Sequence, residues 1–280
     1  MNGWNVLRRS GLGWTLFAGF LVAGYLFPVY WMAATSLKTN AAVYASPPQI
    51  IPWPPILSAY REAVWNNPLT LRSILNSAIV GLGTMLLTLV LAAPAAYALA
   101  RLKLRGATLA ILLLLITQLL PAIVIATPLF VVFSRIGLIN SYPALILANT
   151  TFTLPFAVIL LRPFFLTVPR ELEAAAQIDG CTQFGAFARV ILPLVQPGLL
   201  TVAVFAFLMG WGEFLFAMTL TTNEMIQPAT AALNKFIGQY GTEWNKLMAV
   251  ATTIAIPIII IFASLQRYIV SGLTTGAVKE

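Results

Sequence analysis

One carboxylate stands in the middle of a long apolar run and has the clearest capacity for chemistry. Glu213 is the single charged residue between positions 198 and 220. A charge in hydrocarbon is costly, so Glu213 is expected to face a helix-bundle interior or a wet cavity. There a carboxylate can accept hydrogen bonds from hydroxyl groups, and the neighbouring Trp211 can cover a ring. Further polar candidates in apolar runs are Gln118, Asn149, Thr150, Thr151 and Thr153.

Glu213 also has an interpretation that needs no ligand. A carboxylate inside a helix bundle can serve as a structural hydrogen-bond acceptor for an adjacent helix or for a partner chain. The sequence alone leaves both interpretations of Glu213 open.

The remaining composition excludes the common catalytic and metal-binding arrangements. The chain has no histidine and a single cysteine, Cys181, which rules out His-based triads, His-ligated metals and an intrachain disulfide. We find no Ser-Lys or paired-Asp arrangement within the apolar runs. The sequence also lacks a GxxxxGK[ST] phosphate loop. We therefore expect no enzyme activity, no metal and no cofactor bound by this chain.

The apolar runs are long enough to hold these residues within a membrane. Of 280 residues, 60% are hydrophobic and 9% are charged, whereas a soluble domain carries about 25% charged residues. Spanning a bilayer takes about 20 apolar residues. About six runs meet that length, at residues 13–36, 74–100, 108–133, 143–161, 198–220 and 247–265.

These runs predict an all-α, polytopic membrane protein that forms a single transmembrane domain over residues 1–280. The first run is longer than the roughly 7–15 apolar residues of a signal peptide, so we expect a retained helix rather than a cleaved signal. Prolines within the runs indicate kinked helices around a shaped passage; they are Pro94, Pro121, Pro128, Pro155 and Pro257.

The basic residues orient the predicted helices. If the N-terminus is cytoplasmic, most of the 16 Lys and Arg residues fall in cytoplasmic segments. The cluster Arg101, Lys103 and Arg105 weighs most, because short loops follow the positive-inside rule best. We expect both termini in the cytoplasm. The net charge of +8 then reflects membrane orientation rather than a nucleic-acid partner.

The cytoplasmic segment 167–197 has its own local pattern, TVPRELEAAAQIDGCTQFGAFARVILPLVQP. Pro169 and the two glutamates after it are typical of a helix N-terminus. Gly180 is typical of a helix stop in the left-handed conformation, and Thr182 of the N-cap of a second helix. We predict a short helix, a glycine corner and a second short helix with a small alanine surface.

This segment resembles the EAA loop of ABC importer permeases, whose pattern is Glu-Ala-Ala-x3-Gly-x9-Ile-x-Leu-Pro. The surrounding sequence is similar to the carbohydrate-importer, maltose-type branch of that family. Anchored on Gly180, the pattern places its two alanines on Ala175 and Ala176, and Asp179 matches an Asp-Gly pair common in the branch. The later part of the pattern falls on Val190, Leu192 and Pro193.

One position departs from the family pattern. The glutamate of the pattern falls on Ala174, one residue after Glu173. Either Glu173 substitutes from the adjacent position, or Glu171 or Asp179 carries the acidic contact. The helix–glycine–helix shape does not depend on that choice.

The resemblance implies a permease subunit of an ATP-driven importer for a sugar or sugar-like solute, forming half of the translocation pathway. ATP and Mg²⁺ would bind to a separate ATP-binding-cassette ATPase dimer, and a second permease, usually a different chain, would complete the pathway. The coupling residues would be Glu171, Glu173, Ala174, Ala175, Ala176, Asp179, Gly180, Val190, Leu192 and Pro193.

The same resemblance implies an extracytoplasmic solute-binding protein and a bacterial or archaeal plasma (inner) membrane. Outer-loop candidates for its docking are the segment 47–55, Tyr240 and Trp244, which can equally anchor the loops in lipid headgroups. Glu213 and Trp211 would line the sugar path, with Asn149, Thr153 and Gln118. The alternative is a secondary transporter or channel not driven by ATP, although such proteins usually carry inverted repeats or more buried ion-coupling charges.

Overall fold

The computed structural model describes residues 4–238 and 241–275. The chain divides into two compact units, which are considered separately. The small unit comprises the residues up to Pro68 together with 233–255, and the large unit comprises 69–232 together with the residues from 256 onward.

The small unit consists of helices and one short hairpin. Its β1 and β2 pair antiparallel, with Ile237 opposite Thr242. Its elements are α1 (Trp4–Ser36), α2 (Asn40–Val43), α3 (Ser58–Tyr60), η1 (Arg61–Trp65), η3 (Leu233–Phe236), β1 (Ile237–Gly238), β2 (Gly241–Thr242) and the start of α14 (Trp244–Thr275).

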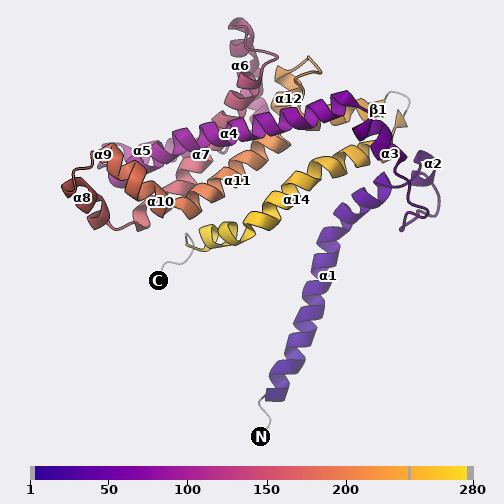
Figure 1. Cartoon of the computed structure of the whole chain (residues 1–280), viewed down its shortest axis with the longest axis horizontal. Helices are drawn as coiled ribbons and strands as arrows, with labels where there is room; N and C mark the ends of the chain where they lie inside the picture. Colours follow the sequence, from indigo (N-terminus) through magenta and orange to yellow (C-terminus); the bar gives the residue numbers. More distant parts are fainter. Residues whose placement is uncertain (1–3, 239–240, 276–280) are drawn as a thin grey trace. The chain divides into compact units, whose positions relative to one another are not determined.

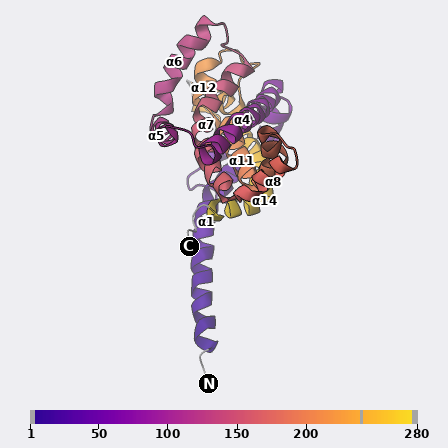
Figure 2. The ribbon, with the colours of Figure 1, turned by 90° about the vertical axis from the view of Figure 1, so that its left-hand side faces the viewer.

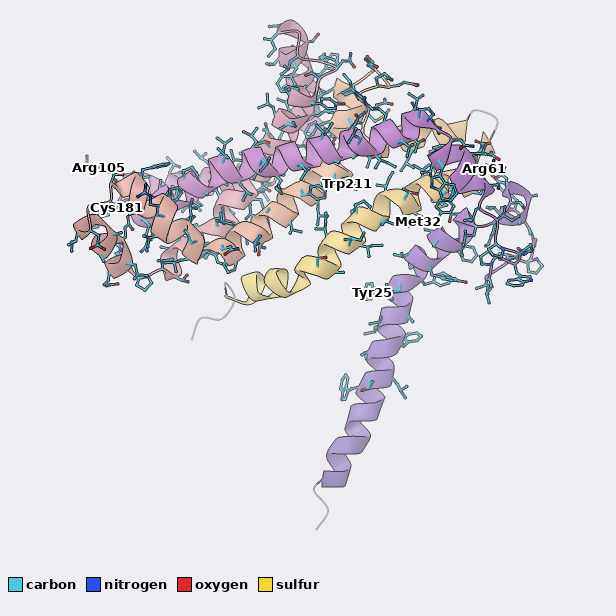
Figure 3. All side chains as sticks on the ribbon, in the orientation of Figure 1. Tyr25, Met32, Arg61, Arg105, Cys181 and Trp211 are labelled. Carbon is cyan, nitrogen blue, oxygen red and sulfur yellow. The ribbon has the colours of Figure 1, made fainter. Side chains whose placement is uncertain are left out.

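Helix α1 contains the predicted run 13–36 and packs little of it within the chain. The side chain of Tyr25, labelled in Figure 3, is 83% exposed. Burial begins near the end of the helix, where Ala34, Thr35 and Ser36 are enclosed. An apolar helix of this length with an exposed surface suits a lipid environment.

Polar contacts close the small unit beyond α1. Lys38 is buried, donates to the carbonyl of Gln49 at 2.5 Å and lies 4.4 Å from the ring centroid of Trp31. Burial lowers the pKa of the Lys38 ammonium group. The ammonium group of Lys246 lies 3.1 Å from carboxylate oxygens of both Glu62 and Glu243.

The large unit is built on three long helices that lie side by side, α4, α7 and α11 (Figures 1 and 2). Helices α8 and α9 lie at one end of this set, and α6 and α12 lie toward the other. The elements are α4 (Pro68–Arg101), α5 (Ala107–Thr117), α6 (Ala122–Arg135), α7 (Tyr142–Thr167), α8 (Arg170–Ile178), α9 (Gln183–Ala186), η2 (Phe187–Ile191), α10 (Leu192–Leu194), α11 (Gln196–Gly212), α12 (Leu215–Leu220) and α13 (Ala229–Ala232).

A stripe of small residues explains how closely these helices pack. Small, buried residues recur every three or four positions along one face of α4: Ser73, Ser77, Gly81, Thr84, Thr88, Ala92, Ala96 and Ala100. Side chains four apart share a helix face, and small residues allow helix backbones to approach closely in a membrane. Thr88 uses this proximity to share a hydrogen bond of 2.7 Å with Thr153 on α7.

Two predicted runs are broken in the structure. The run 108–133 is not one helix, because α5 and α6 meet at a 96° bend around Pro121. Pro121 has no N–H to continue α5, and its extended conformation starts α6 one residue later. The run 198–220 is interrupted after Gly212, where Glu213 adopts an extended conformation before α12 begins.

The other runs form helices longer than predicted. The run 143–161 belongs to α7, which extends to Thr167, and the run 247–265 belongs to α14, which begins at Trp244. Within the described residues, four helices are long and apolar enough to cross a membrane, or up to six if each bent pair is one span. The second bent pair joins residues 183–194 to α11 at 80°. The all-α, polytopic prediction is confirmed.

Candidate functional site

A cavity of about 350 Å³ lies within the large unit. Its walls come from the junction of α5 with α6, from α7, from α11 and from α12. Four of its lining residues are polar, namely Gln118, Asn149, Thr153 and Glu213. Three are aromatic, namely Phe152, Phe205 and Phe216, and the rest are Ala122, Leu208, Met209 and Gly212. The structure therefore brings four of the five predicted pathway residues to one place.

Glu213 has a structural role that its geometry makes plain. Its Oε1 accepts a hydrogen bond from the backbone N–H of Phe216 at 2.7 Å, and its Oε2 accepts one from Ala217 at 2.9 Å. The carboxylate thus caps α12, and the broken helix provides the donors that satisfy a charge in an apolar setting. Each carboxylate oxygen has further lone pairs, so capping and lining the cavity are compatible.

Two other polar residues of the cavity, Gln118 and Asn149, each donate a hydrogen bond to a backbone carbonyl. Gln118 ends α5 and donates from Nε2 to the carbonyl of Phe152 at 3.2 Å. Asn149 donates from Nδ2 to the carbonyl of Leu145 at 2.8 Å, one turn back in α7. These bonds fix the orientation of both amides at the cavity wall.

Trp211 does not line this cavity. Its side chain is 3% exposed and packs on Phe207 with ring centroids 5.6 Å apart. Trp211 and Glu213 are two residues apart, which corresponds to roughly 200° around a helix, so they point in different directions. Figure 3 labels Trp211 on α11. Thr150 and Thr151 also stay outside the lining and bond to carbonyls of their own helix.

The sequence prediction missed the aromatic wall. Phe152 is three residues after Asn149, and this spacing places both side chains on one face of α7. That relation was available once Asn149 was chosen. Phe205 and Phe216 had no such marker, because an apolar residue in an apolar run is not distinctive.

The segment 167–197 adopts the predicted helix–glycine–helix shape. Gly180 has φ +90°, and Cys181 donates from its backbone N–H to the carbonyl of Ala176 at 2.9 Å, which closes the end of α8. The Thr182 hydroxyl accepts from the N–H of Gly185 at 3.1 Å and caps α9. Figure 3 labels Cys181 at the corner. Pro169 differs slightly from expectation, since it is the N-cap of α8 rather than part of its first turn.

The predicted coupling residues fall into two groups by exposure. The exposed group contains Glu171, Ala174, Ala175, Asp179, Gly180 and Pro193. The other group is half-buried or buried and contains Glu173, Ala176, Val190 and Leu192. Hydrophobic side chains also project from this segment, since Ile178 is 86% exposed and Phe184 is 75% exposed. The segment thus presents a small-residue surface edged by acidic and apolar groups.

Glu173 turns toward the end of α4. Its Oε1 accepts a hydrogen bond from the Tyr97 hydroxyl, and its Oε2 lies 3.8 Å from Nε of Arg101. The side chains of Arg101 and Glu173 are 5% and 15% exposed. Arg101 also donates from Nη2 to the carbonyl of Val168 at 2.5 Å, at the joint between α7 and α8.

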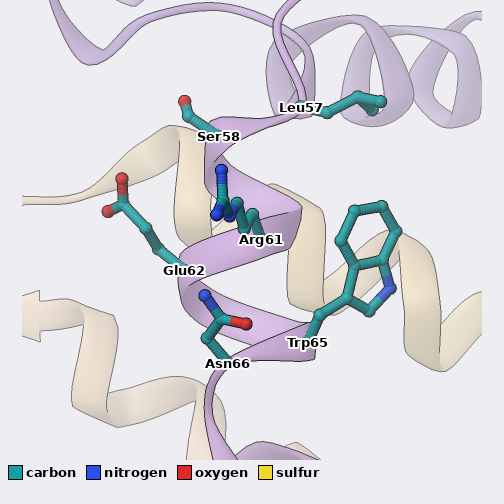
Figure 4. Close-up of a pocket in the computed structure, with 6 residues that line it drawn as sticks. All are labelled: Leu57, Ser58, Arg61, Glu62, Trp65 and Asn66. Carbon is teal, nitrogen blue, oxygen red and sulfur yellow. The ribbon is translucent and has the colours of Figure 1, made fainter.

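A second cavity, of about 550 Å³, opens in the small unit (Figure 4). It is lined by Leu57, Ser58, Arg61, Glu62, Trp65 and Asn66, around the π-helical turn η1. Glu62 and Trp65 extend to opposite sides of this turn. Of the predicted outer-loop candidates, Trp244 is partly exposed at the start of α14, and Tyr240 lies outside the described residues.

No group of three or more metal-ligating side chains occurs among the residues that the structure describes. The described site therefore consists of the cavity, with its single carboxylate, and the helix–glycine–helix segment.

Comparison with known proteins places the chain among transport proteins. The chain is 40% identical to the trehalose transport system permease protein SugB of Mycobacterium tuberculosis, over 92% of this chain and 94% of the relative. It is 36% identical to the sulfoquinovosyl glycerol transport system permease protein SmoH of Agrobacterium fabrum, over 94% of this chain and 92% of the relative.

A solved structure shares the fold. It is a bacterial ABC transporter involved in the import of the acidic polysaccharide alginate, with a TM-score of 0.79 and 23% identity over 93% of this chain and 96% of that chain. The family model described as "Binding-protein-dependent transport system inner membrane component" matches residues 92–275. The chain belongs to this family and is a membrane-embedded permease subunit of an ATP-driven importer, not an enzyme.

Proposed function

We propose that this permease carries a neutral sugar or sugar-like solute and that the cavity around Glu213 forms part of its path. The observation that carries the proposal is the meeting of Gln118, Asn149, Thr153 and Glu213 in one cavity of about 350 Å³. That volume lies near the lower end of the roughly 300–1,000 Å³ typical of small-molecule sites.

The chemistry of the lining favours a hydroxyl-rich, uncharged solute. Amide, hydroxyl and carboxylate oxygens accept hydrogen bonds from sugar hydroxyls, while phenylalanine rings cover the C–H faces of a sugar ring. Neither Lys nor Arg is among the lining residues, and the one charge is negative. An anionic solute such as glycerol phosphate would meet Glu213 without a compensating cation, which disfavours it. The relative named for trehalose transport agrees with a neutral sugar.

We propose that ATP and Mg²⁺ act in a separate ATP-binding-cassette ATPase dimer, whose groove receives the exposed face of α8. A helix docked in a groove passes on displacement without covalent chemistry in the permease. A second permease, different from this chain, completes the pathway, and an extracytoplasmic solute-binding protein delivers the solute. Both termini lie in the cytoplasm of a bacterial or archaeal cell, as the distribution of basic residues favours.

The test uses the complete importer, reconstituted with its ATPase, second permease and binding protein. Asn149→Ala removes one cavity amide, and Thr151→Val is the matched control, because Thr151 lies on the same helix but does not line the cavity. Labelled trehalose, maltose and glycerol phosphate are supplied as solutes. Loss of one hydrogen bond is expected to slow uptake of the neutral sugar about 2- to 10-fold for Asn149→Ala.

Glu213→Gln separates capping from lining. Glutamine keeps one oxygen that can cap α12 but loses the charge. We expect slower sugar uptake, a free energy of unfolding lowered by about 1–3 kcal/mol through the one capping bond that is lost, and binding-protein-stimulated ATP hydrolysis that persists. If Asn149→Ala and Glu213→Gln both transport at the rate of Thr151→Val, the cavity is not on the solute path. Preferred uptake of glycerol phosphate would contradict the neutral-solute assignment.

A further inference from the structure

The two glutamates of the coupling segment have different surroundings. Glu171 is exposed, whereas Glu173 is half-buried and contacts Tyr97 and Arg101 of α4. Residues two apart on a helix are separated by roughly 200°, so Glu171 and Glu173 lie on nearly opposite faces of α8. Ala174 and Asp179 are exposed with Glu171. The face of α8 that is open to another protein is therefore not the face that holds Glu173.

Tyr97 lies where three helical elements meet. Its ring packs edge-on against Phe165 of α7, with ring centroids 5.8 Å apart. It also packs at a tilt against Phe187 of η2, with ring centroids 4.8 Å apart. All three rings are buried within one hydrophobic cluster. The hydrogen bond from the Tyr97 hydroxyl to Glu173 therefore ties α8 to a packed junction of α4, α7 and η2, rather than to a mobile side chain.

Arg101, at the end of α4, makes two further contacts that hold α8 in place. It donates to the carbonyl of Val168, just before α8, and its Nε faces the Glu173 carboxylate at 3.8 Å. Within the described residues, Nε of Arg101 has no hydrogen-bond partner, so the contact with Glu173 is an ion pair. With 5% of its side chain exposed, Arg101 depends on Glu173 for a counterion, because water cannot replace it.

We propose that Glu173 is a positioning residue that transmits the movement of the coupling helix α8 to α4 and α7, and that it does not itself contact the ATPase. This inference rests on the proposed docking of α8 on an ATPase. On this proposal, the acidic contact with the ATPase is made by Glu171 or Asp179 rather than by Glu173. A displaced α8 must carry Glu173 with it, and through Tyr97 and Arg101 it moves the ends of both spanning helices.

The test separates docking from transmission in the complete, reconstituted importer. Docking is measured by photo-cross-linking from a benzophenone on Ile178→Cys in a Cys181→Ser background, since Ile178 is 86% exposed and lies seven residues after Glu171, on the same face of α8. Transmission is measured as the ratio of binding-protein-stimulated to basal ATP hydrolysis. The variants are Glu173→Gln and Tyr97→Phe, which keep side-chain volume and remove the charge or the phenol hydroxyl. Glu171→Gln is the docking comparison on the same helix, because Glu171 is one of the acidic side chains proposed to face the ATPase.

We expect Glu173→Gln and Tyr97→Phe to cross-link to the ATPase like the parent and to lower the stimulated-to-basal ratio about tenfold. Glu173→Gln removes the ion pair with Arg101, whereas Tyr97→Phe removes the hydrogen bond to Glu173, so each variant weakens a different contact between α8 and α4. Glu171→Gln should instead weaken the cross-link to the ATPase, because it removes a charge from the docking face. If Glu173→Gln does not fold, Tyr97→Phe alone carries the test.

Two results would overturn the inference. One is loss of the cross-link in Glu173→Gln with an unchanged ratio in the remaining complexes, which would make Glu173 a docking residue. The other is a parental ratio in both Glu173→Gln and Tyr97→Phe. A parent chain that never cross-links to an ATPase from position 178 would instead refute the proposed docking of α8, and the inference with it.

Discussion

A single methyl group added at Gly210 is expected to loosen the packing of α11 on α4. A Cβ at this position would lie 3.0 Å from the Cα of Gly81 and 2.9 Å from the hydroxyl oxygen of Thr84. The Thr84 side chain can rotate away, but the Cα of Gly81 belongs to the backbone and moves only with its helix. Gly210→Ala therefore forces α4 and α11 apart by several tenths of an ångström.

The magnitude follows from two opposing effects. Overpacking a close-packed interior costs about 1–3 kcal/mol, whereas Ala gains about 1 kcal/mol over Gly in helix propensity. Gly212→Ala is the matched control, because a Cβ at Gly212 meets nothing within 4 Å. The propensity gain is common to both variants, so Gly210→Ala should be less stable than Gly212→Ala by about 1–3 kcal/mol.

Thermal unfolding of the purified chain in one detergent is the assay, followed by tryptophan fluorescence and by the remaining monodisperse fraction. A domain of 150–250 residues changes its Tm by roughly 2–4 °C per kcal/mol. Gly210→Ala should therefore melt roughly 2–12 °C below Gly212→Ala. A Tm for Gly210→Ala equal to or above that of Gly212→Ala would show that α4 and α11 do not pack through these glycines.

Two further predictions concern other backbone positions in the large unit. Asn76 is buried, donates hydrogen bonds to two carbonyls in the segment 225–229 at 3.0 Å each, and accepts one from the Tyr142 hydroxyl at 2.7 Å. Asn76→Ala should lower the free energy of unfolding by about 1–3 kcal/mol and speed amide hydrogen exchange in 225–229. Unchanged exchange there would contradict this account. Gly180 has φ +90°, and a Cβ added there would meet nothing within 4 Å. Gly180→Ala should lower the free energy of unfolding by about 1–2 kcal/mol through the left-handed backbone alone, and Gly180→Asn should retain more uptake, because Asn tolerates that conformation better than Ala. Equal losses of uptake in the two variants would point to a steric rather than a conformational effect.

The helix–glycine–helix segment was predictable because its information is local. A glycine at the end of α8 and a threonine before α9 each determine the conformation of a few neighbouring residues. The two helix breaks were not predicted, because the uniform composition of an apolar run indicates how long the run is and not whether it forms one continuous helix. Pro121 marks the first break, and its restricted φ offered the only local warning.

The cavity was predictable in its polar part and not in its apolar part. A polar group in an apolar run must find a partner or water, so Asn149 and Gln118 were recognisable as inward-facing. Phe205 and Phe216 carry no such requirement, and only the packing of α11 and α12 shows which way they face. Trp211 does not line the cavity although it is close to Glu213 in sequence, because the rotation of the helix separates the directions of the two positions.

The position of α4 in these contacts suggests why the large unit can act as a lever. Its 34 residues extend about 51 Å at 1.5 Å per residue. Near its start, Asn76 and Ser77 hold the segment 225–229, which leads directly to Thr230. Thr230 donates to the backbone carbonyl of Glu213 at 2.5 Å, beside the cavity.

At its other end, α4 holds α8 through Tyr97 and Arg101. One continuous helix therefore carries the hydrogen bonds of the cavity segment at its start and the contacts of the coupling helix at its end. A packed helix transmits displacement as a body, because interiors of this density deform little. Movement of α8 should thus reach Glu213 along α4 without a separate relay, and variants at either end of α4 should alter uptake while leaving basal ATP hydrolysis intact.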